Sequence, residues 1–513
     1  MTQQLQPIDL VAPGFFGLNL QQASSLLGPQ YAVRANNAFI DDSGRLAARD
    51  GFVPLGPALA LDNPVRSVFE YLTSTGGSET IVGFDGGIAN DPTDVAGSSI
   101  AGSVPTANGK WWFQNFNNKV VGFVDGETPI VYDGTGTFNT IVPSSGTAPT
   151  SRGGIGLSAY GRIWALDSDG STIRYTGLLD ETDWGGEGSG LIDMHNVWVD
   201  GTDEVTAIEA FNGALVVFGR RQIIVWTDGQ GFELGLDPDF ISVVDTIQGV
   251  GCLTQWSLQD VGETDLLFLS RNGVQSLARL VIDRSNPVSN LTKTVRDALM
   301  NQVSEADLDL VSSAYSPEEG FYLLTLPDQQ TTWVLDQRRR YSDQDGDTLS
   351  IVTQWDLAPL AWNVQEDGLI LLGNEFAVSR YDSAADNGES FRFEYESPWL
   401  DLGERTANLL KLLKRYGAIL FVTNFTNVEL LWATDFDLEF ESIACPVIGG
   451  GADSEFGTAE YGLGEFGGNL ALRVVQVPAR DTGQYYKLAV EADVTGEFAI
   501  QQLELFTKIG RLA

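Results

Sequence analysis

Apolar and polar residues alternate along most of the chain in short runs that are separated by tight turns. From about residue 65 one unit recurs: an apolar strand, a turn that contains Gly or Asn, and a second apolar strand that often ends at Asp-Gly. Short strands between such turn residues are typical of β structure. Seven hairpins of this kind can be identified, with turns at Gly77, Asn118, Gly161, Gly213, Gly273, Gly320 and Gly368.

The spacing of these hairpins predicts how they are arranged. Successive turn residues are 41, 43, 52, 60, 47 and 48 positions apart, and a period in the forties with several strands per unit is typical of β-propeller blades. One twisted blade cannot bury both of its faces alone, whereas blades stacked around a ring can. Consecutive β-sandwiches would give no such period. We therefore expect an all-β protein with a propeller of about seven blades over residues 65–388.

The repeat is interrupted after the fifth hairpin. Within residues 286–308, four apolar residues follow each other at helical spacing: Leu291, Val295, Leu299 and Val303. This spacing predicts a helical insertion. Such an insertion leaves little room for outer strands in the fifth unit.

The two ends of the chain lack the repeat. Residues 1–64 predict an N-terminal arm and a β-hairpin that turns at Asp42-Ser43-Gly44. This hairpin could complete the last blade and close the ring, or it could pack against a neighbouring domain. Residues 389–513 predict the antiparallel strands of a C-terminal β-sandwich-like domain. A Gly-rich loop at 448–469 interrupts these strands, and loops of this length usually serve a function or a contact.

The chain is strongly acidic, and this narrows its partners. Its 513 residues include 69 Asp or Glu and 30 Lys or Arg, so the net charge is -39. That balance disfavours a basic nucleic-acid footprint and adhesion to anionic membranes. A wall that nucleic acid slides past without binding remains compatible with it, and so does a role in solubility alone.

Cysteine content and hydropathy point to a soluble protein made in the cytoplasm. Cys252 and Cys445 are too few for a disulfide framework. The N-terminus lacks a basic region followed by an apolar one, so no secretory signal is expected. No run approaches the roughly 18 apolar residues of a membrane-spanning helix.

The sequence offers little for catalysis. His195 is the only histidine, so a Ser-His-Asp or Cys-His arrangement would have to include it. One His and two distant Cys exclude a His/Cys zinc site, and no Walker motif is present. Among 69 acidic residues a close carboxylate pair must occur somewhere, so glycosidase chemistry cannot be inferred from such a pair. We expect no enzyme, and we assign no catalytic, cofactor-binding or metal-binding residue.

Two kinds of charged segment have a structural interpretation. The Asp-Gly runs at 167–171 and 343–348 resemble calcium-binding loops but lack the Glu of an EF-hand, so we interpret them as turns and leave calcium binding open. The basic clusters at 220–221, 338–341 and 411–415 are short and without interleaved aromatic residues. We expect them to pair with carboxylates across subunit contacts.

Both ends of the chain carry motifs that resemble a known family. The segment 13–52 runs from a Pro-Gly start to an acidic-Ser-Gly-Arg-Leu turn and an Arg-x-Gly-Phe sequence, and the C-terminal part contains "GLGEFGG" (462–468) and ends in "FTKIGRLA" (506–513). Taken together and in this order along the chain, these motifs resemble those of the nozzle proteins of short-tailed phages, a family that includes the tail tubular protein B type and the packaged-DNA stabilisation type. The N-terminal features are Ala32, Asn36, Asn37, Asp42, Ser43, Gly44, Arg45, Leu46, Arg49, Gly51 and Phe52.

The resemblance implies a structural virion protein rather than an enzyme. It implies a propeller with attached β domains, a homohexameric ring below the portal and the tail adaptor, and a channel that retains the packaged genome and conducts DNA during ejection. Further partners would be tail fibres or spikes and a tip or needle protein, with double-stranded DNA passing without specific binding. The protein would be made in the host cytoplasm and reside in the virion tail, without any cofactor.

Two groups of residues are candidates for the channel wall or for subunit contacts. The first is the acidic loop around Asp343, Asp345 and Asp347, which we expect to face the lumen or a neighbour. The second is the Gly-rich loop, in which Phe456, Tyr461 and Phe466 are candidates for a subunit contact or a channel constriction. The alternative from another class is a carbohydrate-binding or glycan-hydrolysing propeller. A monomeric scaffold with a peptide-binding face is a third.

Overall fold

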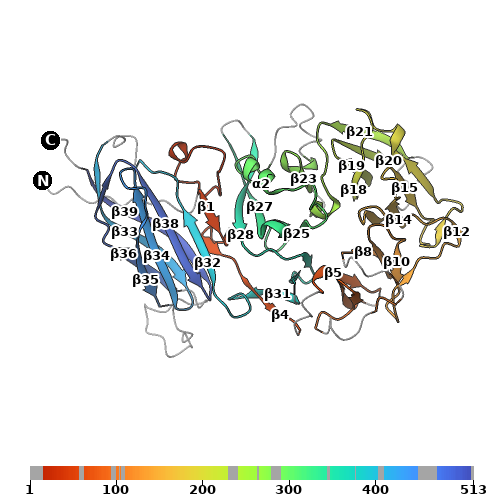
Figure 1. The fold of residues 1–513 in the computed structure, drawn as a ribbon, viewed down its shortest axis with the longest axis horizontal. Helices are drawn as coiled ribbons and strands as arrows, with labels where there is room; N and C mark the ends of the chain where they lie inside the picture. Colours follow the sequence, from red (N-terminus) through yellow and green to blue (C-terminus); the bar gives the residue numbers. More distant parts are fainter. Residues whose placement is uncertain are drawn as a thin grey trace.

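A computed structural model gives the fold. Figure 1 shows an elongated molecule with a ring of small sheets at one end and a β-sandwich at the other. The structure describes residues 15–56, 63–74, 76–93, 100–102, 104, 110–228, 241–262, 265–278, 291–343, 347–375, 377–401, 409–448 and 471–509. Besides the strands, the described residues include one α-helix and the short 3-10 turns η1(Ser24–Leu26), η2(Met194–Asn196), η3(Gln255–Ser257) and η4(Pro327–Gln329).

Seven antiparallel sheets form the ring, and each is one blade. Blade 1 consists of β5(Val65–Leu72), β6(Ser78–Phe84) and β7(Gly87–Ala89), and blade 2 of β8(Trp112–Phe116), β9(Lys119–Phe123), β10(Ile130–Tyr132) and β11(Asn139–Thr140). Blade 3 consists of β13(Gly156–Ala159), β14(Arg162–Leu166), β15(Thr172–Tyr175) and β17(Gly190–Asp193). Blade 4 consists of β18(Val205–Phe211), β19(Ala214–Gly219), β20(Gln222–Thr227) and β21(Ser242–Gln248). The short strands β12(Ser145–Gly146) and β16(Asp183–Trp184) pair beside blade 3.

The later blades include strands from the N-terminal segment. Blade 5 consists of β22(Gln259–Val261), β23(Asp265–Ser270) and β24(Gly273–Ser276). Blade 6 consists of β25(Ser312–Ser316), β26(Phe321–Leu326), β27(Thr331–Ser342) and β28(Thr348–Trp355). Blade 7 consists of β29(Ala361–Val364), β30(Ile370–Gly373), β31(Val378–Ser383) and, from the N-terminal segment, β4(Gly51–Pro54). The first strands of neighbouring blades lie against one another around most of the ring, β18 of blade 4 meets the 3-10 turn η3 before blade 5, and β29 meets β5 to close the ring. The β-propeller prediction is confirmed.

The predicted turns explain why these segments fold as hairpins. Six of the seven turn residues have a positive φ, between 59° at Asn118 and 105° at Gly273. This left-handed conformation is the one that Gly and Asn adopt at least cost. At the first hairpin the positive φ belongs to Gly76 instead of Gly77.

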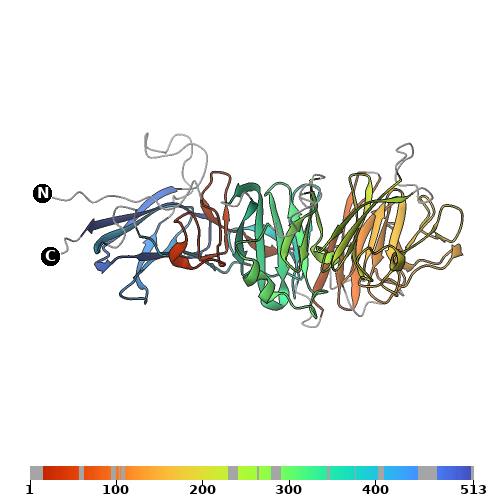
Figure 2. The same cartoon turned by 90° about the horizontal axis from the view of Figure 1, so that it is seen from above.

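The hydrophobic core of the propeller lies between blades. Each apolar cluster joins side chains of two neighbouring sheets. Between blades 4 and 5 the rings of Phe218 and Phe268 lie 5.0 Å apart, and between blades 6 and 7 the rings of Trp355 and Tyr381 stack at 5.5 Å. Figure 2 shows the blades side by side, so that each covers a face of the next.

The predicted helical insertion is only partly correct. The described helix, α2(Arg296–Gln302), covers seven residues and buries Leu299. Leu291 lies before it in a turn, where its backbone N–H bonds to the carbonyl of Val274 on β24 at 3.0 Å. Leu291 thus lies against blade 5 because the strand offers it a hydrogen bond. Three strands are described in this blade.

The N-terminal segment fills both of the roles that the sequence left open. Strand β4 is the outermost strand of blade 7 and pairs with β31, with Phe52 opposite Tyr381. The hairpin β2(Ala38–Ile40) and β3(Leu46–Ala48) instead joins a sheet of the C-terminal sandwich through β39. A chain end that belongs to two units connects them.

The C-terminal sandwich consists of two sheets. The first, which we call the outer sheet, contains β2, β3, β39(Phe498–Ile509), β33(Lys411–Val422) and β36(Ala471–Val477), with β37(Asp481–Gly483) paired to β33. The second contains β32(Phe391–Glu396), β38(Tyr486–Val494), β34(Thr426–Thr434) and β35(Glu441–Val447). The buried side chains of both sheets form one large apolar cluster.

One strand makes propeller and sandwich continuous. β1(Arg34–Asn36) pairs parallel with β28 of blade 6 and antiparallel with β32 of the sandwich. A nine-stranded sheet therefore runs from β25 to β35, and Figure 1 shows it crossing the middle of the molecule. No described helix is long and apolar enough to span a membrane.

Candidate functional site

The predicted acidic loop is a turn held by a lysine. The ammonium group of Lys293 lies 2.7 Å from Asp343 and 2.8 Å from Asp347. The backbone N–H of Asp347 also donates to the Asp343 carboxylate at 2.8 Å. Asp345 lies outside the described residues. The loop thus ends the hairpin of β27 and β28, and which neighbour or lumen it faces stays a prediction.

The other predicted contact residues cannot be placed. Phe456, Tyr461 and Phe466 all lie outside the described residues. Ile448, the first residue of the Gly-rich loop and the last one described before residue 471, is exposed, and its carbonyl accepts a hydrogen bond from Arg473 Nε at 2.8 Å.

The motif residues of the N-terminal segment meet where the propeller joins the sandwich. Asn37 is fully buried and has a φ of 53°. Its side-chain oxygen accepts from Arg49 Nε at 2.9 Å and from the backbone N–H of Asp356 at 3.1 Å. Its amide nitrogen donates to the carbonyl of Arg392 at 2.7 Å. One Asn side chain therefore connects the arm, the loop after blade 6 and the sandwich.

Arg49 is the centre of this region, which we call the joint and define as Asn37, Arg49, Asp50, Asp356 and Asp386. The Arg49 side chain is 1% exposed. Its two terminal nitrogens each lie 2.8 Å from an oxygen of Asp386, and one also lies 3.1 Å from Asp356. The planar guanidinium suits such paired contacts with a carboxylate.

Aromatic and glycine residues complete the joint. The Arg49 guanidinium lies 4.2 Å from the centre of the Phe391 ring, which belongs to the sandwich. Gly51 leaves no room for a side chain, because a Cβ there would overlap the backbone of Ala385 and lie 2.8 Å from its Cα. The Arg-x-Gly spacing of the motif therefore matches two requirements of one packed site.

Asp50 adds a titratable group to the joint. Burial raises its pKa to about 6, and the nearby carboxylates of Glu319, Glu497 and Asp382 act in the same direction. It lines a cavity of about 320 Å³ between the N-terminal hairpin and the sandwich. Arg49 lines this cavity as well, so the ion pairs of the joint lie at its wall.

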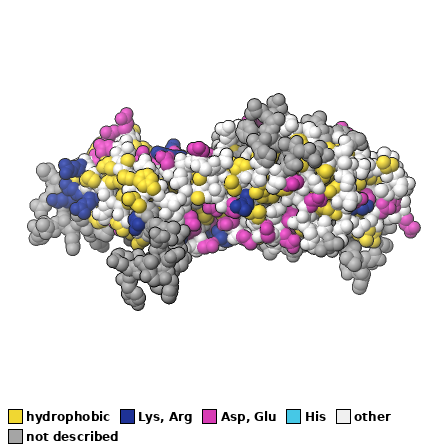
Figure 3. Space-filling view, turned by 90° about the horizontal axis from the view of Figure 1, so that it is seen from below, with side chains coloured by type: hydrophobic (Ala, Val, Ile, Leu, Met, Phe, Trp, Pro, Cys, Tyr) yellow, Lys and Arg dark blue, Asp and Glu magenta, His cyan; other side chains and the backbone are white. Residues whose placement is uncertain are grey.

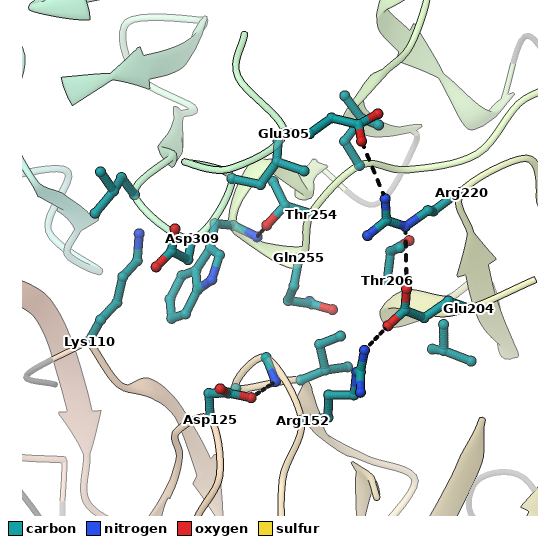
Figure 4. A pocket seen from close by; sticks show the side chains of 18 of the residues that line it. Lys110, Asp125, Arg152, Glu204, Thr206, Arg220, Thr254, Gln255, Glu305 and Asp309 are labelled. Carbon is teal, nitrogen blue, oxygen red and sulfur yellow. Dashed lines mark hydrogen bonds and ion pairs between the residues drawn. The ribbon is translucent and has the colours of Figure 1, made fainter. Parts of the chain in front are cut away.

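A second candidate site lies on the axis of the propeller, where a cavity of about 580 Å³ opens (Figure 4). Its charged groups largely neutralise one another. Glu204 pairs with Arg152 and, at 3.4 Å, with Arg220, which also lies 3.8 Å from Glu305. The Asp125 carboxylate accepts from the backbone N–H of Gly153 at 2.6 Å. The pair of Arg152 with Glu204 connects blade 3 to blade 4, and the pair of Arg220 with Glu305 connects blade 4 to the segment before blade 6.

Lys110 lies at the inner end of this cavity. It is buried, its ammonium group donates to the carbonyl of Val311 at 2.8 Å, and it lies 4.4 Å from the centre of the Trp256 ring. Burial lowers the pKa of Lys110 to about 7, although the carboxylate of Asp309 acts in the opposite direction. The lysine is therefore held by a carbonyl and a ring, without an ion pair to a described carboxylate.

A further cavity of about 340 Å³ shares Arg66, Lys110 and Trp256 with the first one. Aromatic residues line much of it. Burial raises the pKa of Glu209 in its wall to about 7, and Asp260 contributes. Four buried polar atoms of its lining have no hydrogen-bond partner among the described groups: Trp111 Nε1, Trp112 Nε1, Ser312 Oγ and Asn363 Oδ1.

Residues of the basic clusters contact groups of their own chain, whereas ion pairs across subunits were expected. Arg220 pairs with carboxylates of its own chain, and Arg338 pairs with Asp42 at 2.7 Å. Lys411 is buried and donates to the carbonyl of Gln484 at 2.8 Å. For these residues the expectation is wrong, because the fold brings distant carboxylates and carbonyls of the same subunit to them.

The Asp-Gly run at 167–171 is an ordinary turn. The carboxylate of Asp169 accepts from the backbone N–H groups of Ser171 and Thr172, at 2.9 and 2.8 Å. Asp167 pairs with Arg174 at 2.7 Å. Both carboxylates therefore have partners within the hairpin. No group of three potential metal ligands occurs among the described residues.

Comparison with known proteins adds only weak similarities. No protein-family model matches the sequence, and no curated protein is significantly similar to it. Among solved structures, the computationally designed Ika8 protein has 14% identity and a TM-score of 0.36, with coverage of 64% of this chain and 99% of that one. The WD40 β-propeller domain of Doa1 has 12% identity and a TM-score of 0.35, with coverage of 65% and 98%.

An extracellular domain of a putative one-component system from B. thetaiotaomicron has 12% identity and a TM-score of 0.39, with coverage of 92% of this chain and 64% of that one. Because all these TM-scores are below 0.5, the fold assignment depends on the strand pairing of the chain itself.

Proposed function

We propose that the chain is a structural subunit of the tail nozzle of a short-tailed phage, in which copies form a ring that retains the packaged genome and conducts DNA during ejection. The observation that carries the proposal is the position of the motif residues on which the family resemblance depends. Asn37, Arg49 and Gly51 all lie in or beside the joint between the propeller and the sandwich. Because these motif residues have specific packing roles, they support an architecture of propeller and sandwich shared with the nozzle family more strongly than a set of turn residues would.

The charge of the propeller supports a passage for DNA. Residues 65–388 contain 45 acidic and 17 basic residues, and most of the described basic side chains are neutralised by neighbouring carboxylates, as in the axial cavity. Such a surface repels phosphates rather than binding them. A conduit wall requires this property, because a wall that bound the backbone would stop the DNA.

The continuity of the subunit supports a mechanical role. The nine-stranded sheet and the buried Arg49 contacts connect propeller and sandwich without a flexible linker between them. Rigid two-part subunits can hold a fixed position in a ring that resists the pressure of packaged DNA. The proposed partners are the adaptor above, fibres or spikes, and a tip or needle protein, and the proposal includes no catalytic step.

Purified particles provide the direct test. We expect the chain in particles by mass spectrometry, and antibody labelling in electron micrographs should place it at the tail. Particles assembled without the chain should fill with DNA and then lose it. Particles that lack the chain and still hold and deliver their genome would exclude a nozzle role.

A carbohydrate-binding propeller is the second candidate, because the 340 Å³ axial cavity combines aromatic walls with unpartnered polar atoms. Ligand cavities usually combine apolar walls with a few polar groups of this kind. Calorimetric titration with neutral oligosaccharides tests this candidate, with Trp112→Ala as the variant and Trp399→Ala, outside the cavity lining, as the matched control. Binding that Trp112→Ala abolishes and Trp399→Ala retains would support it, whereas no heat with any oligosaccharide would exclude it.

A further inference from the structure

The outer sheet of the sandwich departs from the usual pattern of a one-sided sheet. An antiparallel sheet that packs one face on a core normally presents polar residues on the other face. Here Ile419 lies opposite Val474, and Phe421 lies opposite Leu472. The alternate residues of β33, such as Leu420, are buried in the core, so these pairs point away from it.

Two of these outward residues are exposed, whereas Ile419 and Phe421 are partly buried and the Arg45 guanidinium lies 4.3 Å from the centre of the Phe421 ring. Leu472 is 46% exposed and Val474 is 60% exposed. β36 is also an edge strand, since β33 is its only partner among the described strands. Figure 3 shows hydrophobic side chains gathered on the sandwich part of the molecule, with Lys and Arg side chains beside them near its end. Exposed apolar groups on a sheet edge are typical of protein contact surfaces.

Unpaired basic residues lie on the same sheet. Arg415 lies opposite Phe506, and Lys508 lies opposite Leu412. Both basic side chains are exposed, and neither forms an ion pair with a described carboxylate. This is unusual in a chain with more than two acidic residues for every basic one. Together, Arg415, Ile419, Phe421, Leu472, Val474 and Lys508 form what we call the basic-apolar face, and Glu504, opposite Gly417, adds one carboxylate to it.

The charge of the chain indicates what covers this face. Two copies with a net charge of -39 repel each other unless a positive region of one meets a negative region of the other. The propeller, with 45 acidic and 17 basic residues, is the complementary surface. A contact between two different surfaces of one protein is heterologous, and such contacts repeat around a closed ring.

We propose that the basic-apolar face is the surface by which one copy of the chain docks on the acidic propeller of the next copy. This inference rests on the proposed function in one respect, namely that copies of the chain form a ring. It adds the location and the polarity of the contact: the sandwich of each subunit is directed toward the propeller of its neighbour.

Replacement of one exposed apolar residue tests the contact. Val474→Asp introduces a charge into the face, and Leu438→Asp is the matched control, because Leu438 is 72% exposed in the loop between β34 and β35 of the sandwich, outside both the face and the propeller. Light scattering coupled to size-exclusion chromatography measures the mass of each full-length variant. We expect the wild type and the control at a multiple of 55.5 kDa and Val474→Asp at the mass of one chain, with all three melting at the same temperature.

Charge reversal tests the polar part of the contact. Arg415→Glu with Lys508→Glu should abolish the multimer, whereas Arg34→Glu, a control outside the face and the propeller whose native side chain already pairs with Glu394 of its own chain, should retain it. Added salt should dissociate the wild-type multimer, because it screens exposed charges. A multimer that persists through Val474→Asp and the double reversal overturns the proposal, and so does a wild-type chain that stays monomeric at every concentration.

Photo-cross-linking identifies the occupant of the face. With a benzoyl-phenylalanine at position 474, we expect a cross-link to the propeller of a second copy. A cross-link to the sandwich of a second copy, to another protein or to nucleic acid would overturn the proposal. The two hypotheses fail separately: a multimer that depends on this face but is absent from particles contradicts the nozzle, whereas particles that incorporate Val474→Asp normally contradict only the docking face.

Discussion

Arg49 and Asp386 face each other across the joint with both pairs of atoms at 2.8 Å, although 337 positions separate them in the sequence. Arg49 lies just before β4, the strand that closes the propeller, and Asp386 follows blade 7. Since the same guanidinium covers Phe391 of the sandwich, this pair connects the closure of the ring to the position of the second domain.

Arg49→Ala should destabilise the protein strongly. The substitution leaves the Asp386 carboxylate without its paired contacts and removes one of the two donors to the side-chain oxygen of Asn37, which keeps only the N–H of Asp356. Removing one member of a buried ion pair typically costs about 3 kcal/mol or more. Chemical denaturation followed by tryptophan fluorescence measures this loss. Arg34→Ala is the control, because Arg34 is half exposed in its pair with Glu394, and its loss should cost less than about 1 kcal/mol.

Gly51→Ala should loosen the closure of the ring. A Cβ at this position would overlap the backbone of Ala385, and backbone cannot move aside as a flexible side chain can. Overpacking of this kind typically costs about 1–3 kcal/mol. Gly77→Ala is the matched control, since a Cβ there meets only Thr73 Oγ1 at 3.3 Å. We expect faster amide exchange in β4 and β31 for Gly51→Ala alone, and equal exchange in the two variants would contradict this interpretation.

The sequence predicts the propeller well because blade structure depends on local pattern. Turn residues such as Gly213 and Gly320 adopt the positive φ that their type suggests, and apolar strands follow at short range. The joint could not be predicted in the same way, because Asn36 pairs with Gln354 and Phe52 with Tyr381 across more than three hundred positions. The motif indicated which residues matter, but only the fold shows what they contact.

The axial site was not predictable for a related reason. Its residues come from several blades, as Lys110, Glu209 and Trp256 show. The blades differ in length, so these residues recur at no fixed spacing. The basic-apolar face did leave a signal in the sequence: Ile419, Phe421, Leu472 and Val474 occupy alternate positions that a one-sided sheet would fill with polar residues.

Asp50 should make stability fall as the pH rises from about 4 to about 6. Its pKa is raised from 3.8 to about 6, chiefly by burial. Between these values the folded state therefore holds a proton that the unfolded state has lost, and deprotonation favours unfolding. Asp50→Asn removes this effect. We expect it to raise the unfolding midpoint at pH 7 and to leave it unchanged at pH 3.5.

The matched control for this prediction is Asp437→Asn, because Asp437 is exposed in the loop between β34 and β35 and lies outside the joint. Unfolding curves measured across this pH range should differ from the wild type only for Asp50→Asn. If Asp50→Asn instead lowers the unfolding midpoint at pH 7 below that of the wild type, the ionised Asp50 stabilises the joint and the prediction is wrong.

Lys110 in the axial cavity should make the stability of the wild type rise with pH, which is opposite to the effect of Asp50, and Lys110→Met should remove this dependence. Burial lowers the pKa of Lys110 from 10.5 to about 7, so between these values the unfolded state binds a proton that the folded state lacks. Stability of the wild type should therefore rise with pH across this window, because the cost of removing the proton from Lys110 on folding falls as the pH approaches 10.5. Met fills a similar volume without a charge and can keep the contact with Trp256.

We therefore expect Lys110→Met to be more stable than the wild type at pH 7 and the two proteins to converge toward pH 10. The lost hydrogen bond to Val311 reduces the gain at every pH but does not change its slope. Urea unfolding at several pH values measures the difference, with Lys119→Met as the control, because Lys119 is partly exposed and paired with the carboxylate of Glu181. A constant difference across the window would show that Lys110 keeps its charge, and the axis of the propeller would then have to hold a cation rather than a neutral amine.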